Sequence, residues 1–305
     1  MGPIFVSEFF QHLINGINMG AIYALVALGY TMVYGILQFI NFAHADIYMI
    51  GAFVAYFSAR FFNLGEHPHW IWLFVILGLS SAVCALLGFI IEKLAYRPLR
   101  KSPKINILIT AIGVSLLLEY VGQLIFGADP KLFPPLLNES VLASFGGVDI
   151  MSLDVIILGI SIFSMMGLHW LVYHSKMGKA MRAVSQNSTV AAMLGIHIDR
   201  VISFTFIVGS ALAGIAAVLV GMRYPKIEPM MGMLMGTKAF VAAVLGGIGS
   251  LPGAVIGGLI MGLSEEMVVG YLESTYRDAL SFGILIVILI FRPTGLLGSR
   301  KVEKV

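Results

Sequence analysis

The chain has 305 residues, of which 59% are hydrophobic and 11% are charged. A soluble domain carries about 45–50% apolar and about 25% charged residues. With a mean hydropathy of +0.94, too few polar residues remain to cover a globule in water, which excludes an ordinary soluble enzyme. The net charge of +3 indicates no nucleic-acid surface. Composition therefore predicts an all-α integral membrane protein, a single domain over 1–305 in contact with lipid.

Eight apolar runs follow one another along the chain, and a helix needs about 20 apolar residues to cross the hydrocarbon. We expect all of them to be helical, since an open strand in lipid would leave backbone groups unpaired. The first run has no basic segment before it, so we expect it to be retained and not cleaved as a signal peptide. The runs occupy residues 10–36, 46–62, 70–91, 105–126, 153–173, 201–222, 237–264 and 279–296.

Charge sorts the loops into two classes. Most Lys and Arg residues lie in three loops, which the positive-inside rule assigns to the cytoplasm. The loops between them are acidic and are expected outside, together with the N-terminus, while the C-terminus is expected in the cytoplasm. The basic loops contain Lys93, Arg97, Arg100, Lys101 and Lys104, then Lys176, Lys179, Arg182 and Arg200, then Arg292, Arg300, Lys301 and Lys304; the acidic loops contain Glu66, Asp129, Glu139, Asp149, Glu228, Glu265, Glu266, Glu273 and Asp278.

The run 237–264 conflicts with this orientation, because one full span there would place the acidic loop after it inside. Its middle reads GGIGSLPGAVIGG, and the glycines and Pro252 would break a helix. We therefore expect two half-helices, 237–247 and 252–264, that both enter from outside, together with seven complete crossings. A kinked but complete span is the alternative. Broken backbone at membrane depth is tolerated where it lines a cavity, so this segment should lie beside a permeation path.

The loop 174–200 is too polar to enter lipid. Asn187 or Ser188 can cap a short helix that ends at Gly195, and Asp199 can cap the next span. Such a helix either docks a soluble subunit or packs on its own protein. Its apolar face would be formed by Ala191, Ala192, Met193 and Leu194.

Three segments carry a resemblance to a known family. MRAVSQNSTVAAMLGI (181–196) is similar to the coupling-loop signature of LivH-type permease subunits, which belong to bacterial ATP-binding cassette importers of branched-chain amino acids. NFAHADIYMIGAF (41–53) and the glycine-rich break resemble further segments of that family, in the same order. One departure is visible, since the broader signature has a glutamate before paired alanines and this chain has Val190 there.

The resemblance implies a permease in the bacterial inner membrane that moves branched-chain or other neutral amino acids inward by alternating access. It implies a homologous second permease, two cytoplasmic ATPases that bind ATP and Mg, and a periplasmic substrate-binding protein. The chain itself should bind no cofactor and should not be an enzyme, since it has no G-x-x-x-x-G-K-[ST] loop. Alternatives are an importer of urea or short amides, or a stand-alone secondary transporter. The residues implied in coupling to the ATPase are Lys179, Arg182, Gln186, Asn187, Ser188, Ala191, Ala192, Leu194 and Gly195.

Polar residues at membrane depth are costly and are candidates for the pathway or a gate. Asn15 and Asn18 could instead form hydrogen bonds between helices, and Glu119 could pack inside the bundle. Asn41, His44 and Asp46 could instead form a satisfied cluster at the membrane interface. Thr237 and Ser250 are expected near the ends of the half-helices, where helix dipoles can meet a carboxylate or an ammonium group. His67 and His69 are only two residues apart in an outer loop, where a solvated loop is favoured over a metal site. The pathway or gate candidates are Asn15, Asn18, Asn41, His44, Asp46, Glu119, Thr237 and Ser250.

Overall fold

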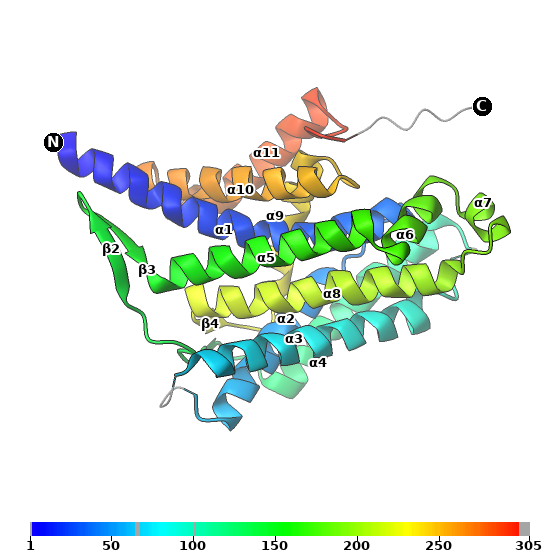
Figure 1. Cartoon of the computed structure of the whole chain (residues 1–305), viewed down its shortest axis with the longest axis horizontal. Helices are drawn as coiled ribbons and strands as arrows, with labels where there is room; N and C mark the ends of the chain where they lie inside the picture. The colour runs from blue at the N-terminus through cyan, green and yellow to red at the C-terminus, as the bar shows by residue number, and fades with distance from the viewer. Residues whose placement is uncertain (1, 65–67, 101, 299–305) are drawn as a thin grey trace.

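The computed structural model describes residues 2–64, 68–100 and 102–298, and in them the chain forms a bundle of long helices (Figure 1). Six residues named above lie outside the described residues: Glu66, His67, Lys101, Arg300, Lys301 and Lys304. The helices are α1 (Gly2–Leu37), α2 (His44–Phe61), α3 (Trp70–Ile91), a π-helix (Glu92–Tyr96), α4 (Lys104–Phe126), α5 (Ser152–His174), α6 (Lys176–Gln186), α7 (Ser188–Met193), α8 (Ile198–Arg223), α9 (Met231–Gly246), α10 (Leu251–Tyr271), a 3-10 turn (Ser274–Tyr276) and α11 (Arg277–Phe291).

Seven helices in the described part of the chain are long and apolar enough to cross a membrane, which agrees with a multi-pass membrane protein. They are not the seven that the sequence predicts. The run 46–62 forms α2, which is not among the seven because Asp46 and Arg60 make its 18 residues less apolar. The helix α10 takes its place among the seven.

The run 237–264 is broken where its glycines predict. Gly247 and Gly249 have φ angles of 103° and 97°, a region that side chains disfavour, and they form the turn between α9 and α10. The second arm is not a half-helix, because α10 continues to Tyr271 and has 21 residues. The turn is supported from the C-terminal segment, whose Leu296 and Leu297 amides donate to the carbonyls of Leu245 and Gly246 at 2.9 Å.

The core forms where glycines let helices approach each other. α1 and α10 lie against each other so closely that a Cβ on Gly20 would stand 2.7 Å from the Cα of Leu259. α8 and α3 meet in the same way, since a Cβ on Gly214 would lie 2.8 Å from the backbone of Ser80. Small residues at such crossings allow the backbone contact and dispersion attraction that hold membrane helices together.

Four short strands add two small sheets that the all-α prediction did not contain. β1 (Lys131–Leu132) pairs antiparallel with β4 (Lys226–Ile227), and β2 (Val141–Phe145) pairs antiparallel with β3 (Val148–Met151). The strands lie in the segments that follow α4 and α8. Figure 1 shows the β2–β3 hairpin at the end of the bundle opposite to α6 and α7.

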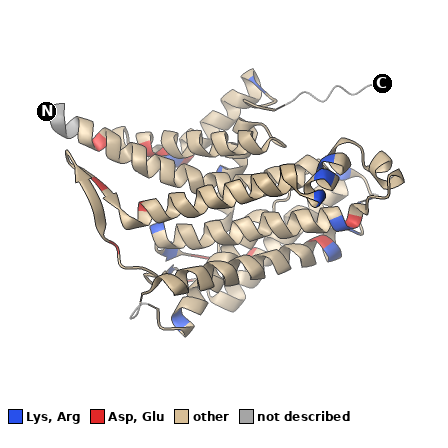
Figure 2. Cartoon of the chain, in the orientation of Figure 1, with Lys and Arg blue, Asp and Glu red and all other residues tan. Residues whose placement is uncertain are grey.

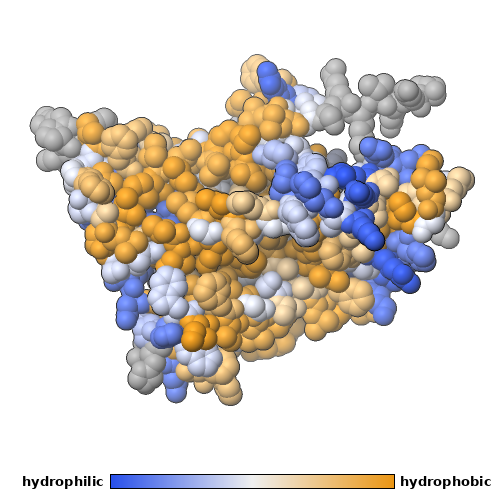
Figure 3. Space-filling view, viewed as in Figure 1, coloured by the Kyte–Doolittle hydropathy of each residue, from blue (hydrophilic) through white to orange (hydrophobic). Residues whose placement is uncertain are grey.

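The two ends of the bundle differ in charge. Lys and Arg gather at the end that carries α6 and α7, which we call the basic end (Figure 2). The side of the bundle between the ends is mostly apolar on the face that Figure 3 shows, as expected for a surface in lipid. The described cations of α6, of the start of α8 and of the segment after α3 that contacts it include Arg97, Arg100, Lys176, Lys179, Arg182 and Arg200.

Candidate functional site

The loop 174–200 holds two short helices at the basic end, where the sequence predicts one. Ser175 caps α6, since its Oγ accepts a hydrogen bond from the Gly178 amide at 2.9 Å. Asn187 caps α7 as predicted, and its Oδ1 accepts from the Val190 amide at 3.0 Å. Gly195 follows α7 with φ of 81°, the left-handed conformation expected of a glycine after a helix.

The outer face of α7 is apolar and open. Val190, Met193 and Leu194 are 49%, 81% and 75% exposed, and Ala192 is also exposed. Ala191 departs from the predicted face, because it is buried against the rest of the protein at 2% exposure. The free apolar face of α7 is therefore built from the larger side chains around Met193.

Among the remaining predicted coupling residues, some side chains are exposed and one is held by hydrogen bonds. Lys179, Gln186 and Ser188 are exposed. Arg182 is fixed, since it donates to the carbonyls of Val172 and Tyr173 at 3.1 and 3.2 Å, at the end of α5. That contact satisfies helix carbonyls that have no partner within α5 itself.

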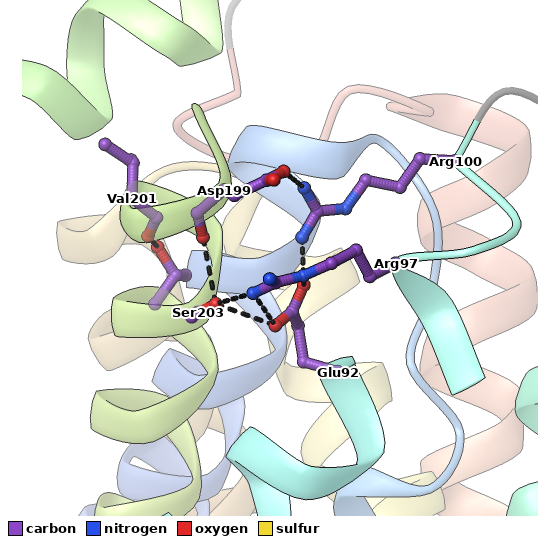
Figure 4. Close-up of polar contacts among 7 residues, drawn as sticks. Glu92, Arg97, Arg100, Asp199, Val201 and Ser203 are labelled. Atoms are coloured by element: carbon purple, nitrogen blue, oxygen red, sulfur yellow. Dashed lines mark hydrogen bonds and ion pairs between the residues drawn. The ribbon is translucent and has the colours of Figure 1, made fainter. Parts of the chain in front are cut away.

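The predicted cap of α8 is wrong, because α8 begins at Ile198 with His197 in the capping position. Asp199 lies in the first turn and its carboxylate pairs with Arg100 at 2.5 Å. This contact belongs to a cluster that we call the charge clamp, formed by Glu92, Arg97, Arg100, Asp199 and Ser203 (Figure 4).

The charge clamp joins the end of α3 to the start of α8. Glu92 is fully buried and pairs with Arg97 at 3.0 Å and also with Arg100. Ser203 donates to Glu92 at 2.7 Å and accepts from Arg97 at 2.6 Å. The hydrogen bond from Arg97 to Glu92 raises the pKa of the Arg97 guanidinium. The contact between α8 and the end of α3 is therefore made by charged groups as well as by packing.

A second feature is a groove along one face of α9. Met233, Thr237, Phe240 and Val244 are spaced by four, three and four residues, so they share one helical face. Three cavities of about 190, 390 and 690 Å³ follow this face. The first two share Met233 and Thr237, and the last two share Phe240. We call this line of cavities the α9 groove.

The α9 groove runs toward the basic end. Its first cavity is lined by Asp278 at the start of α11, and its third by Ser185 of α6 and Ser250 at the hairpin turn. The flanks carry exposed apolar side chains from α4, α9 and α11, namely Ile112, Leu116, Met233, Leu234 and Phe282.

The predicted pathway residues lie in three places. Glu119 and Thr237 line the middle cavity, and Ser250 lines the third. Thr237 is not near a helix end as predicted, since α9 begins six residues earlier at Met231. Ser250 does cap α10, and its Oγ accepts from the Gly253 amide at 3.2 Å.

Asn41, His44 and Asp46 are buried behind the groove. Asn41 accepts a hydrogen bond from the Tyr96 hydroxyl at 2.6 Å, and the His44 ring meets that of Tyr30 edge-on at 4.9 Å. The carboxylate of Asp46 accepts from Ser115, which itself lines the middle cavity.

Asn15 and Asn18 lie elsewhere and join helices, which favours the packing alternative for them. Asn18 donates to Asp154 of α5 at 3.2 Å, and Asn15 accepts from Arg223 of α8 at 2.9 Å. Arg223 and Asp154 are themselves 3.4 Å apart. The four side chains tie α1, α5 and α8 together.

A buried charge network that the sequence did not reveal lies beside the first cavity. Lys238, 5% exposed, pairs with Glu265 at 3.1 Å and with Asp278 at 2.9 Å. Glu265 also accepts from the hydroxyls of Tyr23 at 2.7 Å and Ser281 at 2.9 Å. The assignment of Glu265 and Glu266 to an outer loop is wrong, because both are buried in α10. The sequence did carry one sign of this network, because Lys238 is a lone lysine inside an apolar run and such a charge needs a partner.

Among the described residues, no three His, Cys, Asp or Glu side chains are grouped so that they could hold a metal ion. His69, the described member of the histidine pair, accepts from the amide of Ile71 at 3.3 Å and caps α3.

Comparison with known proteins adds to this geometry. Residues 12–289 match the profile described as "Branched-chain amino acid transport system / permease component". The chain is 42% identical to the high-affinity branched-chain amino acid transport system permease protein LivH of Escherichia coli K12, over 97% of this chain and 98% of that one. It is 41% identical to BraD of Pseudomonas aeruginosa, over 98% and 99% of the two chains. A probable LivH of Methanocaldococcus jannaschii is 31% identical over 90% and 88%.

Proposed function

The chain belongs to the family of permease components of branched-chain amino acid transport systems, and from that premise we propose how it works as one subunit of an importer. A family of this kind supplies a membrane transport subunit and not an enzyme. ATP and Mg are bound and used by partner ATPases. The chain lies in the bacterial inner membrane with its basic end in the cytoplasm and its N-terminus outside, in accord with the distribution of Lys and Arg.

The observation that carries the proposal is the α9 groove. A groove that follows one helix toward the basic end can guide a solute if its open side is closed against lipid. Exposed apolar side chains such as Leu116, Leu234 and Phe282 flank that side. We assign this face to contact with a homologous second permease, so that the path lies between the two subunits. A periplasmic binding protein delivers the amino acid at the end opposite to the basic end.

The exposed face of α7 provides the docking surface for a cytoplasmic ATPase. Closure of the ATPases pushes α7, and α8 follows because only a short turn separates the two helices. The charge clamp passes the displacement to α3 and the π-helix. Alternating access then follows from movement of packed helices about the groove.

The test is ATP-driven uptake of labelled leucine into vesicles that contain the chain with its cognate permease, ATPases and binding protein. Met193→Glu places a charge on the most exposed apolar side chain of α7, so we expect uptake to fall by about tenfold or more while the complex remains in the membrane. Met193→Leu is the matched control, because it keeps an apolar side chain of similar size at the same exposed position of α7.

Unchanged uptake by Met193→Glu would remove α7 from the coupling mechanism. Uptake of leucine by the chain without any ATPase would favour a secondary transporter instead. Uptake of urea or a short amide in place of leucine by the wild-type importer would move the substrate to the alternative class.

A further inference from the structure

The middle cavity of the α9 groove combines an apolar wall with a few polar groups. Its volume is about 390 Å³, and its polar side chains come from Tyr30, Ser115, Glu119 and Thr237. The rest of the wall is mostly apolar and includes Ile112, Leu116, Phe240 and Leu285. A mostly apolar pocket with a small number of placed polar groups is typical of a site for a small ligand.

Glu119 is the polar group that points to a ligand. It is only 8% exposed, and its Oε1 is buried without a hydrogen-bond partner in the described part of the chain. Buried polar atoms are almost always hydrogen-bonded, since leaving one unpaired costs free energy. The side chain lines the cavity, so a ligand there can supply the missing donor.

A second carboxylate lies behind the same wall. Asp46 is buried at 1% exposure and accepts a hydrogen bond from Ser115, which lies one helical turn from Glu119 on α4. Within the described residues, neither Asp46 nor Glu119 forms an ion pair with Lys, Arg or His. The buried carboxylates Glu92 and Glu265, by contrast, each have cationic partners. The middle cavity thus has two acids beside it and lacks a cation.

We propose that Glu119 binds the ammonium group of the transported amino acid in the middle cavity, while the apolar wall receives its side chain. The inference rests on the proposed function and narrows its substrate class. An ammonium group supplies hydrogen-bond donors and a charge that the cavity lacks, and charge-assisted hydrogen bonds are strong. Urea and short amides have no ammonium group, so this cavity discriminates against them.

Photolabelling of the assembled importer tests the site directly. The complex is equilibrated with a diazirine analogue of leucine and illuminated, and the permease is digested for mass spectrometry. We expect adducts on Ile112, Leu116 or Phe240. Isoamylamine, which keeps the ammonium group, should lower their yield by about tenfold or more at concentrations where 4-methylpentanoate, which keeps only the carboxylate, changes it little. Adducts confined to other segments, or equal competition by the two compounds, would overturn the proposal.

A substitution provides the second measurement. Glu119→Gln keeps the size of the side chain and should lower the adduct yield by about tenfold or more, whereas Asp149→Asn, an exposed acid in β3, should leave it unchanged. An unchanged yield in Glu119→Gln contradicts the proposal. If that variant does not assemble, competition on the wild-type importer decides.

The two proposals fail in different ways. Absence of ATP-driven leucine uptake by the wild-type importer counts against the proposed function. Normal uptake without amine-sensitive adducts in the groove counts against the ammonium site alone.

Discussion

Single glycines decide how closely the central helices of this protein pack. At Gly20 the backbones of α1 and α10 are so near that any side chain would meet the backbone of Leu259 or Gly258. Neither is the flexible end of a side chain, so the helices themselves would have to move. Tight packing of this kind transmits strain and does not absorb it.

We expect Gly20→Ala to destabilise the permease by about 1–3 kcal/mol, the usual cost of overpacking a core. Thermal unfolding in detergent measures this. Gly113→Ala is the control, since a Cβ there meets nothing within 4 Å and alanine is the better helix former. Equal unfolding temperatures for the two variants would show that the α1–α10 contact is looser than described.

Local rules predict single residues well where the contact is local. The Asn187 cap and the Gly195 helix end need only neighbouring backbone, and both are present. Asp199 has the sequence of a cap, yet its carboxylate bonds to Arg100, a residue 99 positions away. Such a partner follows from the tertiary fold, which is why the sequence did not reveal it.

Among the elements, the α9–α10 hairpin depends on a buried charge pair. Lys238 on α9 and Glu265 on α10 are both nearly inaccessible and 3.1 Å apart. Without Lys238, Glu265 keeps only the longer contact to Arg277, at 3.7 Å, among its ion pairs in the described residues. A buried charge that loses its partner costs more than the loss of the whole pair.

Lys238→Met should therefore destabilise the protein by about 3–5 kcal/mol. The double variant Lys238→Met with Glu265→Gln should recover part of the loss, because the buried carboxylate that lost its nearer cation is gone. A double-mutant cycle on unfolding temperature gives the coupling. Additive losses would show that the two side chains act independently.

The break in this hairpin was predictable because glycine and proline act on the backbone locally. The length of α10 was not, since Glu265 and Glu266 read as a loop unless their partners His12, Lys238 and Arg277 are known. The strands β1 and β4 were not predictable for the same reason, because two-residue strands exist only as a pair.

At the scale of the whole molecule, the α9 groove divides α9 into an open face and a packed face. Phe240 is partly exposed in the groove, while Ala243 is fully buried on the other side. The chain has one cysteine, Cys84, which is buried. An introduced cysteine can therefore report access without a competing surface thiol.

We expect Phe240→Cys to react with a water-soluble maleimide in the assembled importer, while Ala243→Cys remains unlabelled. The two reaction rates should differ by about tenfold or more, as expected between an open and a protected site. An excess of leucine with the binding protein and ATP should slow the reaction at Phe240→Cys. Equal labelling at both positions would exclude a one-sided groove. The sequence indicated a path beside this segment, but the groove itself needs α4 and α11, which only the fold brings to α9.

The bonds from Leu296 and Leu297 to the carbonyls of Leu245 and Gly246 have a consequence for biosynthesis. The turn of the hairpin forms the wall of the third cavity, yet its carbonyls gain these donors only after α11 and the segment beyond it have been made. While the chain is still growing, the hairpin carries unpaired backbone groups near one edge of the membrane. The order of synthesis thus makes the end of the groove nearest the basic end late to close.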